Sequence, residues 1–287
     1  MNASTRVIVA SAMLVVIATH ADARTLIQNK GSDTLVNVAQ AWAEAYQTVN
    51  PQVAVAVSGG GSGTGIAAMI NGTVDIANAS RQMKESETKL AQERGHNPVE
   101  YIVGYDALAV FIHPNNPLDA LTGEELAQIY GRNGKVRNWS DLGIKVPGCR
   151  DEMVVISRQN NSGTYAYFRE AVLGKQKYRN GTLDMNGSKE VVDLVEKTPC
   201  AIGYSGLAYA TDRVKMVCVS KDGRPCSMPS VETASDGTYP IARPLIMYTN
   251  GEPEGEIKKY IDWIMSDEGQ CIISRKGYAP VRLVRCN

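Results

Sequence analysis

The sequence predicts an α/β protein of two lobes with a ligand cleft between them. Strand-like apolar runs alternate with helical patterns along most of the 287 residues, which is typical of parallel strands connected by crossover helices. Two apolar runs, centred near Ala109 and Leu245, are longer than the others. We expect them to be two hinge strands, so that the first lobe comprises residues 24–105 and 246–287 and the second lobe residues 106–245.

The individual elements follow from the hydrophobic pattern. We expect strands within residues 25–34, 53–65, 74–81, 101–114, 152–164, 201–210 and 240–250, and helices over 36–50, 66–73, 121–131, 166–174, 188–199 and 256–270. A polar loop separates the two halves at residues 134–143. Ligands of such folds bind near the carboxyl ends of the strands, so we expect the site in the turns that follow the strands.

The composition excludes several function classes. The chain is 44% hydrophobic and 21% charged, which is ordinary for a globular protein and excludes disorder and collagen. Lys plus Arg and Asp plus Glu are both 30, so no positive excess favours binding to nucleic acid. The sequence has only three histidines and no CxxC pair, so it contains no pattern typical of a zinc or other metal site.

The N-terminal residues have the pattern of a secretory signal peptide. Arg6 precedes an apolar run of 12 residues, and Ala21-Asp22-Ala23 fits the cleavage rule for residues 1–23. The run is shorter than the roughly 20 residues that span a bilayer as a helix, although an uncleaved anchor is the alternative. We therefore expect a periplasmic or otherwise secreted protein that begins near Arg24.

Export to an oxidising compartment favours disulfides among the six cysteines, which allow about 15 pairings. They are Cys149, Cys200, Cys218, Cys226, Cys271 and Cys286. Proximity in the sequence suggests the pairs Cys218 with Cys226 and Cys271 with Cys286, which leaves the other two. Free buried thiols are the alternative for some of them.

One turn type occurs three times: a strand, then Gly with Ser or Thr, then a helix. The turns are Gly31–Thr34, Ser58–Gly65 and Ser162–Thr164. Each helix begins with backbone N–H groups that have no intrahelical partner, and the hydroxyls add further donors. A helix N-terminus of this kind binds anions, so three of them can converge on one oxyanion. The alternative is that each Ser or Thr only caps its helix.

Two arginines strengthen the anion interpretation. Arg81 ends the third predicted strand and Arg158 lies just before the third turn, where strand carboxyl ends should meet. The guanidinium fork matches a tetrahedral oxyanion. A surface ion pair is the alternative for either residue.

Motifs for nucleotide chemistry and for hydrolysis are absent from the sequence. Ile66 and Ala67 stand where a phosphate-binding Walker loop requires Lys and Ser or Thr, and no GxGxxG is present. No GxSxG surrounds a serine, and neither His96 nor His113 lies in a context that suggests a catalytic triad. We expect no cofactor and no catalysis.

Four segments together resemble the periplasmic phosphate-binding proteins that supply phosphate ABC importers. They are GSDTL (31–35), SGGGSGTGIAAMINGTVDIANASR (58–81), LTGEELAQIYGRNGKVRNWSDLG (121–143) and SRQNNSGTY (157–165). The resemblance covers essentially the whole chain after residue 23. It implies a class II periplasmic-binding fold that closes two lobes around one dehydrated phosphate, with a membrane permease as partner. We expect a monomer.

The resemblance also implies the ligand residues. The phosphate-binding candidates are Ser32, Asp33, Thr34, Ser62, Gly63, Arg81, Arg158, Ser162, Gly163 and Thr164, with Ser80, Asn160 and Asn161 around them. Arg81 and Asn160 depart from the family, which usually has Asp at both positions. The first of those aspartates is thought to accept the proton of phosphate, which sulfate lacks. We hypothesise that Asp33 replaces it; a role limited to the first helical turn is the alternative.

The predicted function is therefore capture of inorganic phosphate for an ABC importer. Another tetrahedral oxyanion, such as sulfate, molybdate or a phosphate ester, is the nearest alternative ligand. An exported phosphohydrolase and an exported phosphate-sensing or adhesive protein are alternatives of other classes.

Overall fold

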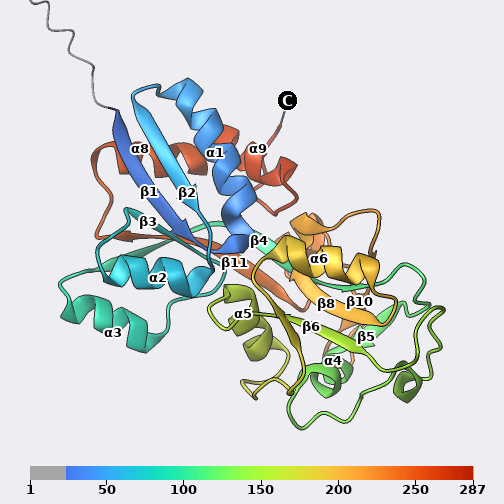
Figure 1. The fold of residues 1–287 in the computed structure, drawn as a ribbon. Coiled ribbons are helices and arrows are strands. Elements are labelled where there is room, and N and C mark those ends of the chain that lie inside the picture. Colours follow the sequence, from blue (N-terminus) through green and yellow to red (C-terminus); the bar gives the residue numbers. More distant parts are fainter. Residues whose placement is uncertain (1–23, 287) are drawn as a thin grey trace, which may run out of the picture.

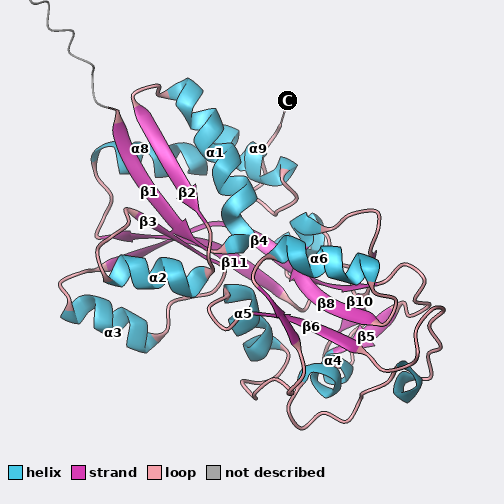
Figure 2. Cartoon of the chain, viewed as in Figure 1, coloured by secondary structure: helices cyan, strands magenta, loops and turns pink. Residues whose placement is uncertain are grey.

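One curled nine-stranded sheet runs through both lobes of the protein. The computed structural model describes residues 24–286, so the predicted signal peptide lies outside the described residues. Figure 1 shows the two lobes, one built around β1, β2 and β3 and the other around β6 and β8. Figure 2 shows helices flanking the strands in each lobe. The predicted two-lobed α/β fold is confirmed.

The elements follow in chain order. The strands are β1 (Thr25–Gly31), β2 (Val53–Ser58), β3 (Ile76–Ala79), β4 (Pro98–Ile112), β5 (Ala120–Thr122), β6 (Val154–Arg158), β7 (Leu183–Met185), β8 (Ala201–Gly206), β9 (Lys215–Met216), β10 (Cys218–Ser220) and β11 (Ala242–Asn250). The α-helices are α1 (Val36–Val49), α2 (Ser62–Ile70), α3 (Glu85–Glu93), α4 (Gly123–Tyr130), α5 (Gly163–Ala171), α6 (Ser188–Lys197), α7 (Val231–Ser235), α8 (Gly255–Met265) and α9 (Asp267–Arg275). Short 3-10 helices cover Asp33–Leu35, Trp139–Leu142 and Leu207–Tyr209.

The strand order is β2-β1-β3-β11-β4-β8-β6-β7, with β9 also paired to β4. β1 pairs in parallel with β2 and β3, and β6 pairs in parallel with β8 and β7. β11 lies antiparallel between β3 and β4, and the end of β4 continues antiparallel to β8. β4 and β11 therefore connect the two lobes, as expected of the two long apolar runs. A separate small sheet consists of β5 and β10.

Each lobe has a buried core on both faces of its part of the sheet. Trp42 and Tyr260 lie in the cluster under α1 and α8, while Met69 belongs to the cluster under α2. In the other lobe, Phe168 and Val191 lie in two further clusters. Because helices cover both faces, the central strands are apolar on both sides, which explains their continuous hydrophobic runs.

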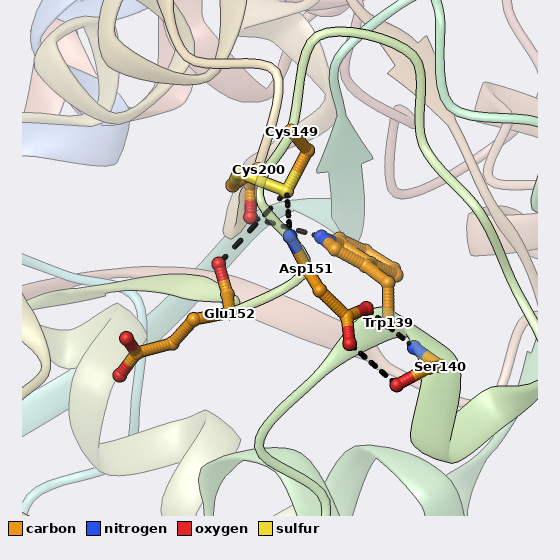
Figure 3. Close-up of a disulfide and its surroundings, with 6 residues drawn as sticks. All are labelled: Trp139, Ser140, Cys149, Asp151, Glu152 and Cys200. Carbon is orange, nitrogen blue, oxygen red and sulfur yellow. Dashed lines mark hydrogen bonds between the residues drawn. A yellow bond between two sulfur atoms is a disulfide. The ribbon is translucent and has the colours of Figure 1, made fainter.

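All six cysteines are paired, as Cys149–Cys200, Cys218–Cys226 and Cys271–Cys286, which confirms the pairing suggested by proximity. Cys149–Cys200 joins residues 51 positions apart (Figure 3). Next to it, the Trp139 indole N–H donates to the carbonyl of Cys200 at 3.1 Å, and the backbone N–H of Ser140 donates to Asp151. This disulfide and its hydrogen bonds hold the long loop before β6 against the start of β8.

The structure differs from the predicted elements at several places, since β5, β7, β9, β10, α3 and α7 were not predicted. The helix predicted over 256–270 is two helices, because the Ser266 hydroxyl donates to the carbonyl of Trp263 and accepts from the N–H of Gly269, which ends α8 and begins α9. Helix α3 has no counterpart in the prediction, since Ala91 is its only buried residue and it carries no apolar stripe. Among residues 24–286, no helix is long and apolar enough to cross a bilayer.

Candidate anion site between the lobes

Three turns of the first lobe lie at one edge of its sheet. β1, β2 and β3 are parallel, so the turns that follow them meet at the same edge. The N–H of Ser32 donates to the carbonyl of Asn78 at 2.8 Å, and the N–H of Gly61 donates to that of Gly31 at 2.9 Å. Gly61 has φ +95°, in the left-handed region that favours glycine. The sequence after each strand thus brings the starts of α1 and α2 together.

Three serine hydroxyls meet at this edge. The Ser32 hydroxyl donates to that of Ser80 at 3.0 Å, and the hydroxyls of Ser62 and Ser80 are 3.3 Å apart. The backbone N–H of Ser80 also donates to the Ser62 hydroxyl at 3.0 Å. All three side chains are buried. Because neither Ser32 nor Ser62 makes a helix-capping hydrogen bond, capping does not account for them.

The second lobe contributes the third turn, at the end of β6. Ser162 caps α5 by accepting from the N–H groups of Thr164 and Tyr165, so the capping alternative holds for its hydroxyl. The hydroxyl of Thr164 lies 3.1 Å from that of Thr34 in the first lobe. Gly163 leaves no room for a side chain, since a Cβ there would lie 2.2 Å from the Ser62 hydroxyl. We call the hydroxyls of Ser32, Thr34, Ser62, Ser80 and Thr164 the hydroxyl cluster.

Hydrogen bonds to the backbone also join the glycine-rich turn of the first lobe to the third turn. The N–H of Gly63 donates to the carbonyl of Asn161 at 2.9 Å, and the side-chain amide of Asn161 donates to the carbonyl of Gly60 at 2.9 Å. The predicted residues of the first and third turns and the glycine-rich turn therefore lie together, although Thr34 and Thr164, for example, are 130 positions apart in the sequence.

Arg158 lies beside the hydroxyl cluster, buried to 1% exposure. Its guanidinium donates to the carbonyls of Met185 and Asn186, to the Ser188 hydroxyl, and to Asp33 Oδ2 at 3.3 Å. Burial lowers the pKa of Arg158, and the nearby Asp33 carboxylate opposes that shift. Four of its five N–H donors are used within residues 24–286, so the side chain is held rigidly.

Asp33 bridges the lobes. Its Oδ2 accepts from the N–H of Ser188 at 2.6 Å as well as from Arg158, and the Tyr209 hydroxyl donates to its backbone carbonyl at 2.8 Å. The carboxylate that we expected to accept a ligand proton is therefore engaged by the second lobe.

Arg81 points to a different place. It makes a two-pronged ion pair with Glu87, with both N···O distances 2.8 Å, and donates to the carbonyl of Gln82. It lines a cavity of about 910 Å³ together with Lys84, Asn160 and Arg169. This cavity lies between segments of both lobes, so Arg81 and Asn160 border the cleft and make no hydrogen bond to the hydroxyl cluster among the described residues.

A second buried ion pair lies beside the cluster, and sequence reasoning missed it. Arg243 on β11 and Asp106 on β4 are register partners with both side chains at 0% exposure. Arg243 donates to Asp106 Oδ2 at 2.8 and 3.1 Å, to the Thr34 hydroxyl at 3.1 Å and to the carbonyl of Ser80 at 3.4 Å. The sequence did contain a signal for this pair, because each of the two long apolar runs includes one charged residue, Asp106 in the first and Arg243 in the second.

The charges beside the cluster cancel in pairs, Arg158 with Asp33 and Arg243 with Asp106. Hydroxyls and helix N-termini are then the groups that an anion meets. The described residues contain no group of His, Cys, Asp and Glu that could hold a metal ion. The hydroxyl cluster is therefore buried, and the charges beside it are paired.

The chain is similar to known proteins over most of its length. Residues 18–268 match the PBP superfamily domain. The phosphate-binding protein PstS of Pseudomonas aeruginosa is 33% identical over 267 residues, which cover 89% of this chain and 83% of that protein. The chain belongs to the PstS family of the PBP superfamily.

Two further similarities extend over most of the chain. SphX of Synechococcus elongatus is 31% identical, over 90% of this chain and 78% of that protein. A Clostridium perfringens substrate-binding protein assigned to phosphate ABC transport, crystallised with bound phosphate, is 30% identical with a TM-score of 0.77, over 90% of this chain and 100% of that one.

Proposed function

We propose that this protein captures inorganic phosphate outside the cytoplasm and delivers it to the membrane permease of an ABC importer. The observation that carries the proposal is the hydroxyl cluster, in which residues from both lobes meet at three turns that begin helices. Phosphate is the ligand that we propose, because the PstS relative is a phosphate-binding protein and the Clostridium perfringens protein was crystallised with bound phosphate.

In the proposed site, phosphate is held between the lobes. The residues that we assign to it are Ser32, Asp33 and Thr34, Ser62 and Gly63, Arg158, and Ser162, Gly163 and Thr164. Hydroxyls and backbone N–H groups donate to the phosphate oxygens, and Arg158 holds Asp33 and the start of α6 in position. Arg81, with Asn160, borders the entry to the site, where its positive charge attracts anions.

Binding of this kind needs no chemistry. A dehydrated oxyanion must exchange its water contacts for protein donors. Hydrogen bonds to a charged group contribute about 1.5–3 kcal/mol each, and micromolar affinity corresponds to about 8 kcal/mol. The donors of three turns are enough, so we propose a binding protein without catalysis or cofactor, which acts as a monomer and has no nucleic-acid partner.

Closure of the lobes is the proposed link to transport. We assign residues 24–105 with 246–287 to the first lobe and 106–245 to the second, since the core clusters divide near these positions. The bridge from Asp33 to Ser188 and Arg158 joins the lobes and supports a closed arrangement. A permease that docks only the closed arrangement would accept only the loaded protein.

Calorimetric titration of the protein lacking residues 1–23 tests the proposed ligand. We expect phosphate to bind with micromolar or tighter affinity and to remain bound in excess sulfate. Thr164→Val should weaken binding about tenfold by removing one hydroxyl of the cluster. Thr88→Val, in the outer helix α3 (Figure 1), is the matched control and should change nothing. Absence of phosphate binding, or its loss in sulfate, would contradict the proposal.

A further inference from the structure

A buried carboxylate beside the hydroxyl cluster has one oxygen without a partner. Asp106 lies on β4 with its side chain at 0% exposure. Its Oδ2 accepts both hydrogen bonds from Arg243, whereas its Oδ1 has no hydrogen-bond partner among residues 24–286. Other buried polar atoms without partners belong to Asn and Tyr side chains, so this is the one carboxylate oxygen in that state in the described chain. A buried charged acceptor without a donor is costly, which indicates that a donor is supplied by something else.

The surroundings of Asp106 lead to the proposed phosphate site. A Cβ at Gly206 would lie 3.1 and 3.2 Å from the two carboxylate oxygens and 3.3 Å from the Thr34 methyl group. Asp106 and Thr34 therefore border the same small space. The Thr34 hydroxyl in turn contacts both Arg243 and Thr164. One carboxylate oxygen is thus available next to the hydroxyls that we assign to phosphate.

We propose that Asp106 Oδ1 accepts a hydrogen bond from the protonated oxygen of bound phosphate and so makes the site select phosphate over fully ionised tetrahedral anions. The inference rests on the proposed function. Phosphate carries a proton at neutral pH and can donate, whereas sulfate has none and would place an acceptor against an acceptor. Buried groups that the wrong ligand leaves unpaired give strong discrimination.

Asp33 is the competing carboxylate, and its contacts fit another role. Its Oδ2 already accepts from Ser188 and Arg158, and its side chain is 26% exposed. A carboxylate engaged in this way holds the lobes together without distinguishing the ligand's protonation. Burial raises the pKa of the Asp106 carboxyl, and the charge of Arg243 opposes this rise and favours the ionised form that can accept a hydrogen bond.

Matched variants separate the two carboxylates. Dissociation constants for phosphate and for sulfate are measured by calorimetry at pH 7 on the unchanged protein, Asp106→Asn and Asp33→Asn. The amide that Asp106→Asn introduces could turn its NH2 group to sulfate, so we expect this variant to bind sulfate more tightly and to lose at least tenfold of the preference for phosphate. Asp33→Asn should weaken both anions by a similar factor and keep their ratio within about threefold of the unchanged protein.

A double variant tests the inference if Asp106→Asn does not fold. If Asp106→Asn leaves Arg243 uncompensated and fails to fold, the double variant Asp106→Asn with Arg243→Gln removes both charges and should show the same loss of preference. A preference that survives in the folded Asp106→Asn variant, or that is lost in Asp33→Asn instead, would overturn the inference alone. Absence of phosphate binding by the unchanged protein would overturn the proposed function and the inference with it.

Discussion

Two arginine–aspartate pairs flank the hydroxyl cluster, and they differ in what they join. Arg243 and Asp106 lie on adjacent strands, 2.8 Å apart and inaccessible to solvent. Arg158 and Asp33 come from different lobes, lie 3.3 Å apart, and leave Asp33 partly exposed. The first pair belongs to the strands that connect the lobes and does not need closure to form. The second requires the lobes to meet. We call Arg243–Asp106 the fixed pair and Arg158–Asp33 the bridging pair. We infer that the fixed pair helps to select the anion and that the bridging pair joins the lobes when they close.

The largest expected effect is on the fixed pair. Arg243→Met would leave the Asp106 charge buried without its partner, and we expect it to lower the free energy of unfolding by about 3–5 kcal/mol. Denaturant unfolding without ligand measures this. Arg282→Met, which removes an exposed ion pair with Asp267, is the control and should cost less than about 1 kcal/mol. Equal effects of the two substitutions would contradict the distinction.

The bridging pair should act on affinity. Lysine cannot reproduce the hydrogen bonds of Arg158 to Asn186, Ser188 and Asp33, so Arg158→Lys should weaken phosphate binding roughly 10- to 100-fold. Arg81→Lys is the matched control, because its fork contacts Glu87 instead, and should change affinity less than about threefold. Calorimetry compares them. A larger loss in Arg81→Lys would mean that the cavity near Arg81 holds the anion.

Closure can be blocked by one methyl group. In Gly163→Ala, a Cβ would lie 2.2 Å from the Ser62 hydroxyl and 2.5 Å from that of Ser80, so the two turns could not meet as they do here. We expect a cost of about 1–3 kcal/mol in phosphate binding, or roughly 5- to 150-fold. Gly123→Ala, also at the first residue of a helix but with ample space, should bind normally. Normal binding by both variants would argue against closure at Gly163.

The smallest effect is expected at Arg81 and Glu87. Burial alone would raise the pKa of Glu87, but hydrogen bonds from Arg81 and the Lys84 N–H lower it below its ordinary 4.5. A lowered pKa means that the charged form stabilises the fold above about pH 4.5 and that this contribution is lost as pH falls below it. Glu87→Gln should therefore cost about 1 kcal/mol or less at pH 7, by thermal unfolding, and this difference should shrink as the pH falls below 4.5. If the stability difference between Glu87→Gln and the unchanged protein did not change with pH, the ion pair could not be its cause.

The sequence was sufficient for most of the fold because parallel strands buried on both faces leave continuous apolar runs. It was also sufficient for the three turns, since glycine and hydroxyl residues after a strand are a local signal. The sequence did not reveal features that depend on which residues pair across the sheet. Asp106 and Arg243 are 137 positions apart, and only the β4–β11 register shows that they meet.

Arg81 and Asp33 illustrate the same limit on the scale of one side chain. Arg81 lies in the turn after β3, at the predicted edge, yet its guanidinium turns to Glu87, six residues further along the chain. Asp33 lies in the first turn, yet its carboxylate is engaged by Ser188 of the other lobe. Position in the sequence located both residues correctly, but the direction of each side chain depended on a neighbour that no local pattern reveals.

A crystal structure of the protein with phosphate tests the central claim most directly. The account predicts one phosphate between the lobes, with oxygen atoms within hydrogen-bond distance of the Ser32, Ser62 and Thr164 side chains and of Asp106 Oδ1. Phosphate bound instead beside Arg81 in the cleft cavity, with the hydroxyl cluster unchanged, would contradict it.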